Sequence, residues 1–211
     1  MFTSSLRRIA CCGLPLLAAC SSGSVEPPIG PVPTVVDTSF SVNALRAAAG
    51  APEIANPVVT FYAKAGEDRE AFMYYRKRPT GNDSTVFVRF RVSKDALLTR
   101  PDGSPFAPGD SILITITLTD PTRLIVAFAP SGLRFSTANP AKLKLSFLET
   151  DDDLNEDGVV DSRDTALQSL LSVWRRETAA APWVKQASIL AIGSHEIETD
   201  VGGFTDYIIA W

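Results

Sequence analysis

One stretch of the sequence, from Asp151 to Asp164, places oxygen-bearing side chains at regular intervals around a glycine. A loop that wraps Ca²⁺ in twelve residues carries side-chain oxygens at positions 1, 3, 5, 9 and 12, a glycine at position 6 and a ligating backbone carbonyl at position 7. Gly158 sets the register, because placing it at position 6 makes Asp153 position 1. The sequence therefore predicts a Ca²⁺ site whose ligands are Asp153, Asn155, Asp157, Val159, Asp161 and Asp164.

Two further positions of this loop characterise it. Position 8 holds Val160, whose apolar side chain we expect to point inward and anchor the loop. Position 12 holds Asp164 where Glu is commoner, and in this respect the loop resembles those of dockerin domains. A dockerin uses two such loops, each followed by a helix, to form its protein-binding surface, and this sequence contains one. Two roles stay open: a cation that stabilises the fold, and a dockerin-like protein-docking module.

A helix is predicted directly after the loop, over residues 162–177. Leu167, Leu170, Leu171 and Trp174 recur at the spacing of one helix face. In residues 142–149, before the loop, apolar and polar residues alternate as they do in a strand, so we expect a helix on one side of the loop only. Burial of Leu167 and Trp174 would indicate a structural helix, whereas an exposed apolar patch would favour docking.

Most of the chain from residue 39 onward shows the period of two that predicts half-buried strands. In residues 85–92, Val88 and Phe90 alternate with Arg89 and Arg91. Similar segments, separated by turn-forming residues, are residues 58–65, 71–77, 111–119 and 142–149. We therefore expect a mainly β fold over residues 39–211, an antiparallel β-sandwich into which the Ca²⁺ loop 153–164 and one helix are inserted.

The second half of this domain carries two family-like motifs. Pro130-Ser131-Gly132-Leu133-Arg134-Phe135 followed by Pro140-Ala141-Lys142-Leu143, and the closing Phe204-Thr205-Asp206-Tyr207-Ile208-Ile209-Ala210, resemble the signature of the ZU-five domain. That family is named after zonula occludens proteins and the Unc-five netrin receptors. The resemblance spans residues 111–211 and is loose over residues 40–100. It implies a sandwich with an interaction or structural role, although the acidic loop and helix interrupt the family's pattern here.

The N-terminus has the pattern of a secretory signal peptide over residues 1–19. Arg7 and Arg8 precede an apolar run too short to span a membrane, and small residues follow. Leu17-Ala18-Ala19-Cys20 resembles the lipobox of bacterial lipoproteins, in which the cysteine is diacylated and becomes the mature N-terminus. This implies a lipid on Cys20 and, through it, a membrane partner in the bacterial cell envelope, at the outer membrane, facing the periplasm or at the cell surface. Residues 20–38 are rich in Pro, Ser and Gly and predict a tether.

Composition narrows the possible partners. Eight of the 24 acids lie between Glu149 and Asp164 beside a single base, so the acidity of the chain is concentrated at the loop. No basic stripe accompanies it, and we expect no nucleic-acid partner. Cys11 and Cys12 lie in the predicted signal peptide and Cys20 would carry lipid, which leaves no thiol for a disulfide.

Catalytic patterns are sparse. His195 is the only histidine, and neither a Gly-x-Ser-x-Gly elbow nor zinc-ligand spacing accompanies it. We therefore expect no enzyme, with a carboxylate-based hydrolase as the exception that the sequence leaves open. An unidentified glycan is a second possible partner beside a protein, because aromatic strand residues could form a carbohydrate platform, although such residues are more often core. These residues are Tyr62, Phe72, Tyr74 and Tyr75.

Overall fold

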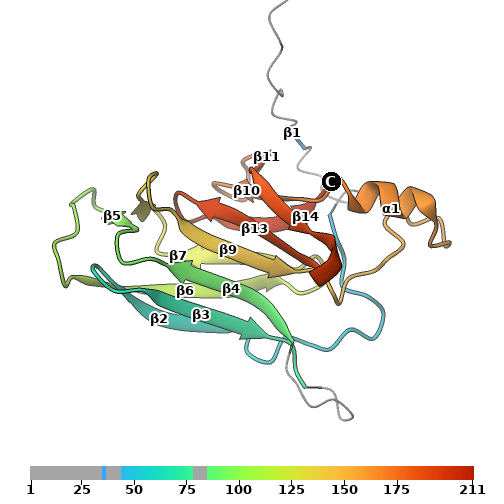
Figure 1. Ribbon diagram of the computed structural model, residues 1–211, viewed down its shortest axis with the longest axis horizontal. Coiled ribbons are helices and arrows are strands. Elements are labelled where there is room, and N and C mark those ends of the chain that lie inside the picture. The colour runs from blue at the N-terminus through green and yellow to red at the C-terminus, as the bar shows by residue number, and fades with distance from the viewer. Residues whose placement is uncertain (1–34, 37–43, 78–84) are drawn as a thin grey trace, which may run out of the picture. The chain divides into compact units, whose positions relative to one another are not determined.

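Two antiparallel β-sheets form the layers of this fold, which is known from a computed structural model that describes residues 35–36, 44–77 and 85–211 (Figure 1). The larger sheet has seven strands in the order β1-β11-β10-β14-β7-β6-β2. In chain order these are β1 (Val35–Val36), β2 (Val58–Lys64), β6 (Ser111–Asp120), β7 (Ile125–Ala129), β10 (Ser172–Arg176), β11 (Trp183–Lys185) and β14 (Asp206–Ala210).

The second sheet has five strands in the order β12-β13-β9-β4-β3. These are β3 (Arg69–Tyr74), β4 (Val86–Val92), β9 (Ala141–Ser146), β12 (Ser188–Ala191) and β13 (Glu196–Val201). Three short elements lie outside these two sheets: the paired strands β5 (Leu97–Thr99) and β8 (Arg134–Phe135), and the 3₁₀ turn η1 (Ile192–Ser194). The one α-helix of the described residues is α1 (Ser162–Gln168).

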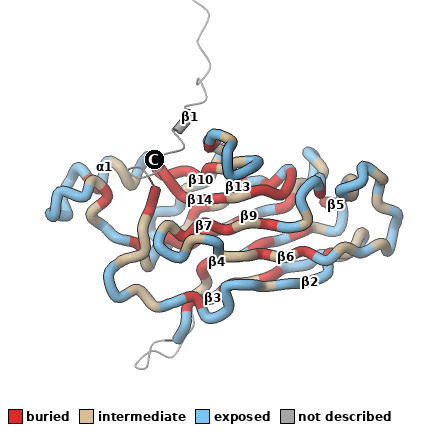
Figure 2. Tube along the Cα trace, turned by 180° about the vertical axis from the view of Figure 1, so that it is seen from behind, coloured by how far each residue is buried: buried red, intermediate tan, exposed pale blue. Residues whose placement is uncertain are grey.

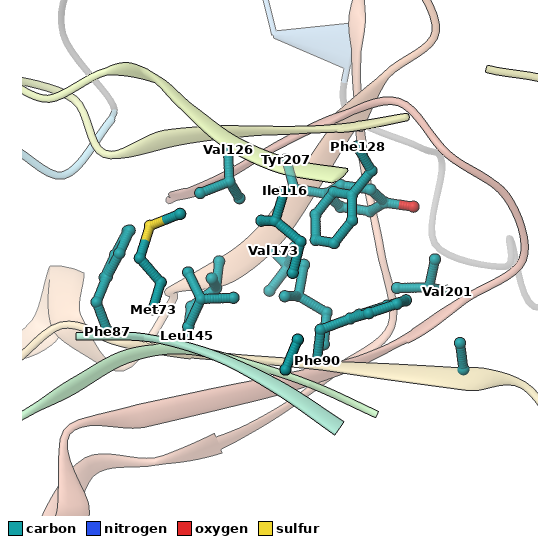
Figure 3. Packing of buried hydrophobic residues seen from close by; sticks show 14 of the residues in the cluster. Met73, Phe87, Phe90, Ile116, Val126, Phe128, Leu145, Val173, Val201 and Tyr207 are labelled. Atoms are coloured by element: carbon teal, nitrogen blue, oxygen red, sulfur yellow. The ribbon is translucent and has the colours of Figure 1, made fainter. Parts of the chain in front are cut away.

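The core lies between the two sheets and is rich in aromatic rings. Figure 3 shows Phe128, Val126 and Ile116 of one layer facing Phe90 and Leu145 of the other. The ring of Phe90 lies 4.9 Å from that of Phe128 and 5.7 Å from that of Phe204, measured between centroids. Burial of apolar area of this kind is the main favourable term in folding. The two antiparallel sheets that enclose this core confirm the predicted antiparallel sandwich.

The alternating segments of the sequence form strands as predicted. In β4, Val88, Phe90 and Val92 are buried while Arg89 and Arg91 are exposed. The segments predicted at residues 58–65 and 71–77 correspond to β2 and β3, but these strands belong to different sheets. The turn through Gly66 therefore carries the chain from one layer to the other, and period-two patterns alone do not reveal that step.

The predicted helix over residues 162–177 is wrong in its second half. The helix ends at Gln168, and Ser172–Arg176 form strand β10. The four apolar residues do not share a helix face, because Trp174 pairs with Ile208 of β14 and its indole N–H donates to the carbonyl of Ala210 at 3.1 Å. Val173 faces the main core, and Trp174 faces a second apolar cluster, so β10 is buried on both faces. A strand buried on both faces is apolar at successive positions, and this is why its sequence also fits the apolar spacing of a helix.

The predicted tether also contributes to the sandwich. Val35 and Val36, within the tether predicted over residues 20–38, form β1 and pair with Val184 and Trp183 of β11. A β-branched dipeptide suits a strand, and pairing satisfies backbone groups at the edge of the sheet. The rest of this predicted tether, the signal peptide and Cys20 lie outside the described residues.

The acidic loop and α1 connect the two layers. The chain leaves β9 in the five-stranded sheet, passes through the loop and α1, and enters β10 in the seven-stranded sheet. Figure 1 shows α1 beyond one end of the strands and β5 toward the other. Whatever stabilises this connection therefore stabilises the junction between the sheets.

Candidate cation-binding loop

The loop is attached to the core through Leu154. This side chain is 7% exposed and belongs to the main hydrophobic cluster, whereas Glu156, Asp157 and Val159 on the following turn are exposed. Figure 2 shows the same contrast, with mostly exposed residues near α1 and a short buried stretch where the chain meets the sheets. One apolar residue thus fixes the base of an otherwise solvated loop.

Asp164 closes the loop from its other end. Its side chain is 3% exposed, and its Oδ1 accepts hydrogen bonds from the N–H groups of Leu154 at 2.8 Å and Asn155 at 3.2 Å. Its Oδ2 accepts from the N–H of Asp161 at 2.8 Å. The last residue of the predicted loop therefore binds the backbone near the loop's start and the cap of α1 together.

Asp161 begins the helix that follows. Its carboxylate accepts from the N–H of Arg163 at 2.7 Å, and with Asp164 it completes a reciprocal capping box at the helix N-terminus. Such a box satisfies amide groups that a helix leaves without intrahelical partners. Two predicted ligands therefore also have a structural task as helix caps.

The first three predicted ligands curl around the turn. Asp153 accepts from the N–H of Gly158 at 2.8 Å and of Asp157 at 3.2 Å, and Asn155 Oδ1 accepts from the N–H of Asp157 at 2.9 Å. Asp157 Oδ1 accepts from the N–H of Val159 at 3.0 Å. The side chains at positions 1, 3 and 5 are thus all turned toward the backbone of their own loop.

The backbone of the turn requires the glycine. Gly158 has φ +85, a conformation that side chains other than glycine rarely adopt, and Glu156 two residues earlier has φ 59. Gly158 lies at the position where a twelve-residue Ca²⁺ loop makes its sharp turn. The backbone at this position therefore has the form that the predicted register requires.

The donor set is suited to a hard cation, because every side chain in it offers oxygen and four of the five are carboxylates. The carboxylates do not surround a common centre, however. Among the described residues, no group of three or more Asp, Glu, His or Cys side chains is gathered so that it could hold a metal ion. Ca²⁺ binding would require these side chains to converge. The amide N–H partners at positions 1, 3 and 5 need not be lost, because each carboxylate or amide oxygen that accepts one hydrogen bond keeps a second lone pair.

Hydrogen bonding controls the charge of Asp164. The backbone N–H of Asp161, followed by those of Asn155 and Leu154, holds the pKa of the Asp164 carboxyl below its usual range, although burial acts in the opposite direction. Hydrogen bonds to the charged form of a carboxyl have this effect in general. Asp164 is therefore ionised at neutral pH.

The prediction for Val160 is wrong. Its side chain is 64% exposed and does not anchor the loop, and Leu154 at position 2 does so instead. A single leucine within a run of acids was the signal in the sequence for this anchor. Which of the two residues is buried depends on where the loop meets the sandwich, and the cluster beneath Leu154 provides the apolar surface.

The other singled-out residues lie apart from the loop. His195 follows η1 in the turn before β13, and its ring packs edge to face against Phe147, with 5.5 Å between the ring centroids. The four aromatic residues do not form one platform. Tyr75 is buried in the core, Tyr62 is exposed on β2 of the seven-stranded sheet, and Phe72 and Tyr74 stack on β3 of the five-stranded sheet.

No helix of the described residues is long and apolar enough to cross a membrane. Comparisons of the chain with protein families, with characterised proteins and with solved structures found no match. The protein is thus an antiparallel β-sandwich whose two sheets are connected by an acidic loop, and this loop supplies the N-terminal cap of α1.

Proposed function

We propose that this chain is a Ca²⁺-binding lipoprotein of the bacterial cell envelope, anchored through lipid on Cys20, whose ZU-five-like sandwich acts as a structural or binding module. The observation that carries the cation proposal is the agreement between ligand spacing and backbone form. Oxygen donors occur at the required positions around Gly158, and that glycine has the φ of +85 that the sharp turn requires.

A bound cation would offset repulsion within the loop. Asp153, Asp157, Asp161 and Asp164 lie within twelve residues, and Arg163 is the one base in that stretch, at 3.4 Å from Asp157. Ca²⁺ among these groups would neutralise like charges that otherwise destabilise the connection between the sheets. Its role would then be to stabilise the fold.

The structural role is favoured over docking by the apolar residues around the helix. Trp174 is 2% exposed and Leu167 packs against the main cluster, so neither belongs to an exposed apolar patch. A dockerin-like docking surface, the alternative, would have to use the exposed apolar side chains beside the loop, Val159, Val160 and Leu170, in place of Leu167 and Trp174. No catalytic role is proposed.

Thermal unfolding tests the cation proposal. Extracellular Ca²⁺ modules bind with Kd of about 10⁻⁴–10⁻³ M, so 5 mM Ca²⁺ against excess chelator should raise Tm by roughly 2–8 °C. Asp153→Asn should abolish most of this increase, because it removes the negative charge of a ligand. The Asn side chain keeps an oxygen acceptor, so the change in shape is small. Asp152→Asn, the same change at the exposed neighbour outside the predicted ligand set, should retain it.

Isothermal titration calorimetry completes the test. The unmodified chain should bind one Ca²⁺ ion, and 5 mM Mg²⁺ should replace the effect only weakly, because Mg²⁺ loses its water reluctantly. No heat of binding together with an unchanged Tm would refute the proposal.

A further inference from the structure

A short segment that enters the sandwich, residues 44–48, runs beside the beginning of the acidic loop; we name it the lead-in segment. The N–H of Asp151 donates to the carbonyl of Arg46 at 2.9 Å, and the N–H of Ala48 donates to the carbonyl of Glu149 at 3.0 Å. Ala47 forms a β-bridge with Thr150. The backbone just before the loop is therefore paired with the lead-in segment.

The lead-in segment also reaches the turn of the loop through a side chain. The guanidinium of Arg46 lies 2.7 Å from Oε1 of Glu156, and both side chains are partly exposed. Glu156 occupies position 4, between the predicted ligands Asn155 and Asp157, and has no ligand role itself. An ion pair at this point holds the turn that carries positions 3 and 5.

Apolar contacts join the same two parts of the chain. Leu45 and Leu154 belong to one hydrophobic cluster. Leu45 also lines two small cavities, of about 140 Å³ and 200 Å³, which are bordered on the loop side by Asp164 and by Gly158 respectively. Backbone pairing, an ion pair and shared apolar burial thus link the lead-in segment to both ends of the predicted site.

We propose that Arg46 is a positioning residue for the cation loop, and that cation binding and docking of the lead-in segment are coupled through the Arg46–Glu156 pair. This inference rests on the proposed Ca²⁺ site. A cation that orders the turn also orders Glu156, and Glu156 holds Arg46. By reciprocity, a firmly docked lead-in segment must strengthen cation binding by the same factor.

The test removes the pair without changing net charge. The double variant Arg46→Gln with Glu156→Gln eliminates one positive and one negative group, so long-range attraction of the cation stays the same. A partly exposed ion pair is worth about 0.2–1 kcal/mol, so Ca²⁺ should bind up to roughly fivefold more weakly. The charge swap Arg46→Glu with Glu156→Arg restores the pair and should recover the affinity.

Hydrogen exchange of the full chain, measured by mass spectrometry with Ca²⁺ and with chelator, gives the second readout. In the unmodified chain Ca²⁺ should slow exchange of the lead-in segment; in the double variant this effect should shrink, and in the charge swap it should return. Arg76→Gln with Glu53→Gln removes another surface pair, 3.2 Å apart, and should leave affinity and exchange at the loop unchanged.

The possible failures are distinguishable. Ca²⁺ binding with no change in exchange of residues 44–48, or a double variant that binds as tightly as the unmodified chain, overturns the coupling and leaves the proposed Ca²⁺ site intact. Absence of Ca²⁺ binding by the unmodified chain overturns the site and the coupling together.

Discussion

Asp110 stabilises a turn through a charge that can be titrated. Its carboxylate accepts from the N–H of Ala107 at 2.8 Å and from the guanidinium of Arg100 at 2.6 Å. The Ala107 N–H and the Arg100 guanidinium hold the pKa of the Asp110 carboxyl below its usual range. This arrangement closes the loop that leads into β6.

The sign of the resulting pH dependence follows from the lowered pKa. The contribution of Asp110 is complete above the pKa of the unfolded carboxyl, about 4, and is lost as pH falls through the lower pKa of the folded chain. Asp110→Asn should therefore have a lower Tm than the unmodified chain at pH 7 and a smaller fall in Tm between roughly pH 5 and pH 2. Parallel Tm curves over the whole range would contradict this.

At the scale of elements, the end of α1 shows the limit of a periodic pattern. Leu167, Leu171 and Trp174 fit one helix face, yet only Leu167 lies in the helix. The pairing of β10 with β14 satisfies the backbone of Trp174 and buries its ring at the same time. Since that pairing joins residues more than thirty positions apart (Trp174 to Ile208), local spacing does not contain it.

Two alanine substitutions separate the predicted helix from the observed strand. Trp174→Ala should destabilise the fold by about 3–5 kcal/mol, because it empties a buried site. Leu170→Ala should change stability by less than about 0.5 kcal/mol, because Leu170 is 54% exposed. Urea unfolding monitored by circular dichroism measures both, and equal losses would indicate that residues 162–177 form one helix.

At the scale of the whole molecule, the absence of thiols after Cys20 leaves stability to the core and to the connection between the sheets. The sequence contains three cysteines, at positions 11, 12 and 20. The rings around Phe90 fill the space between the layers, and Leu154 and Asp164 fasten the connection at one end. A proposed cation would therefore act at the junction of the two layers.

The proposed anchor is tested on the whole chain expressed in a bacterium with lipoprotein processing. Cys20→Ser should move the protein from the membrane fraction to the soluble fraction and abolish incorporation of labelled fatty acid, because a diacylated cysteine supplies the two chains that stable attachment needs. Cys12→Ser, within the predicted signal peptide, should leave both properties unchanged. Membrane retention of the Cys20 variant would refute lipid anchoring.

The sequence by itself determined the features that depend on neighbours along the chain. Alternation in residues 85–92 predicted which side of β4 is buried, and the position of Gly158 predicted where the acidic loop turns. Both follow from local geometry: side chains alternate along a strand, and a left-handed turn favours glycine.

Only the tertiary structure decided the features that depend on distant contacts. It separated β2 and β3 into different sheets, ended α1 at Gln168, and buried Leu154 in place of Val160. It also brought Arg46 to Glu156, which stand far apart in the sequence. Each outcome is set by which apolar surface and which backbone partner the folded chain presents at that point, and no spacing within a short segment encodes that choice.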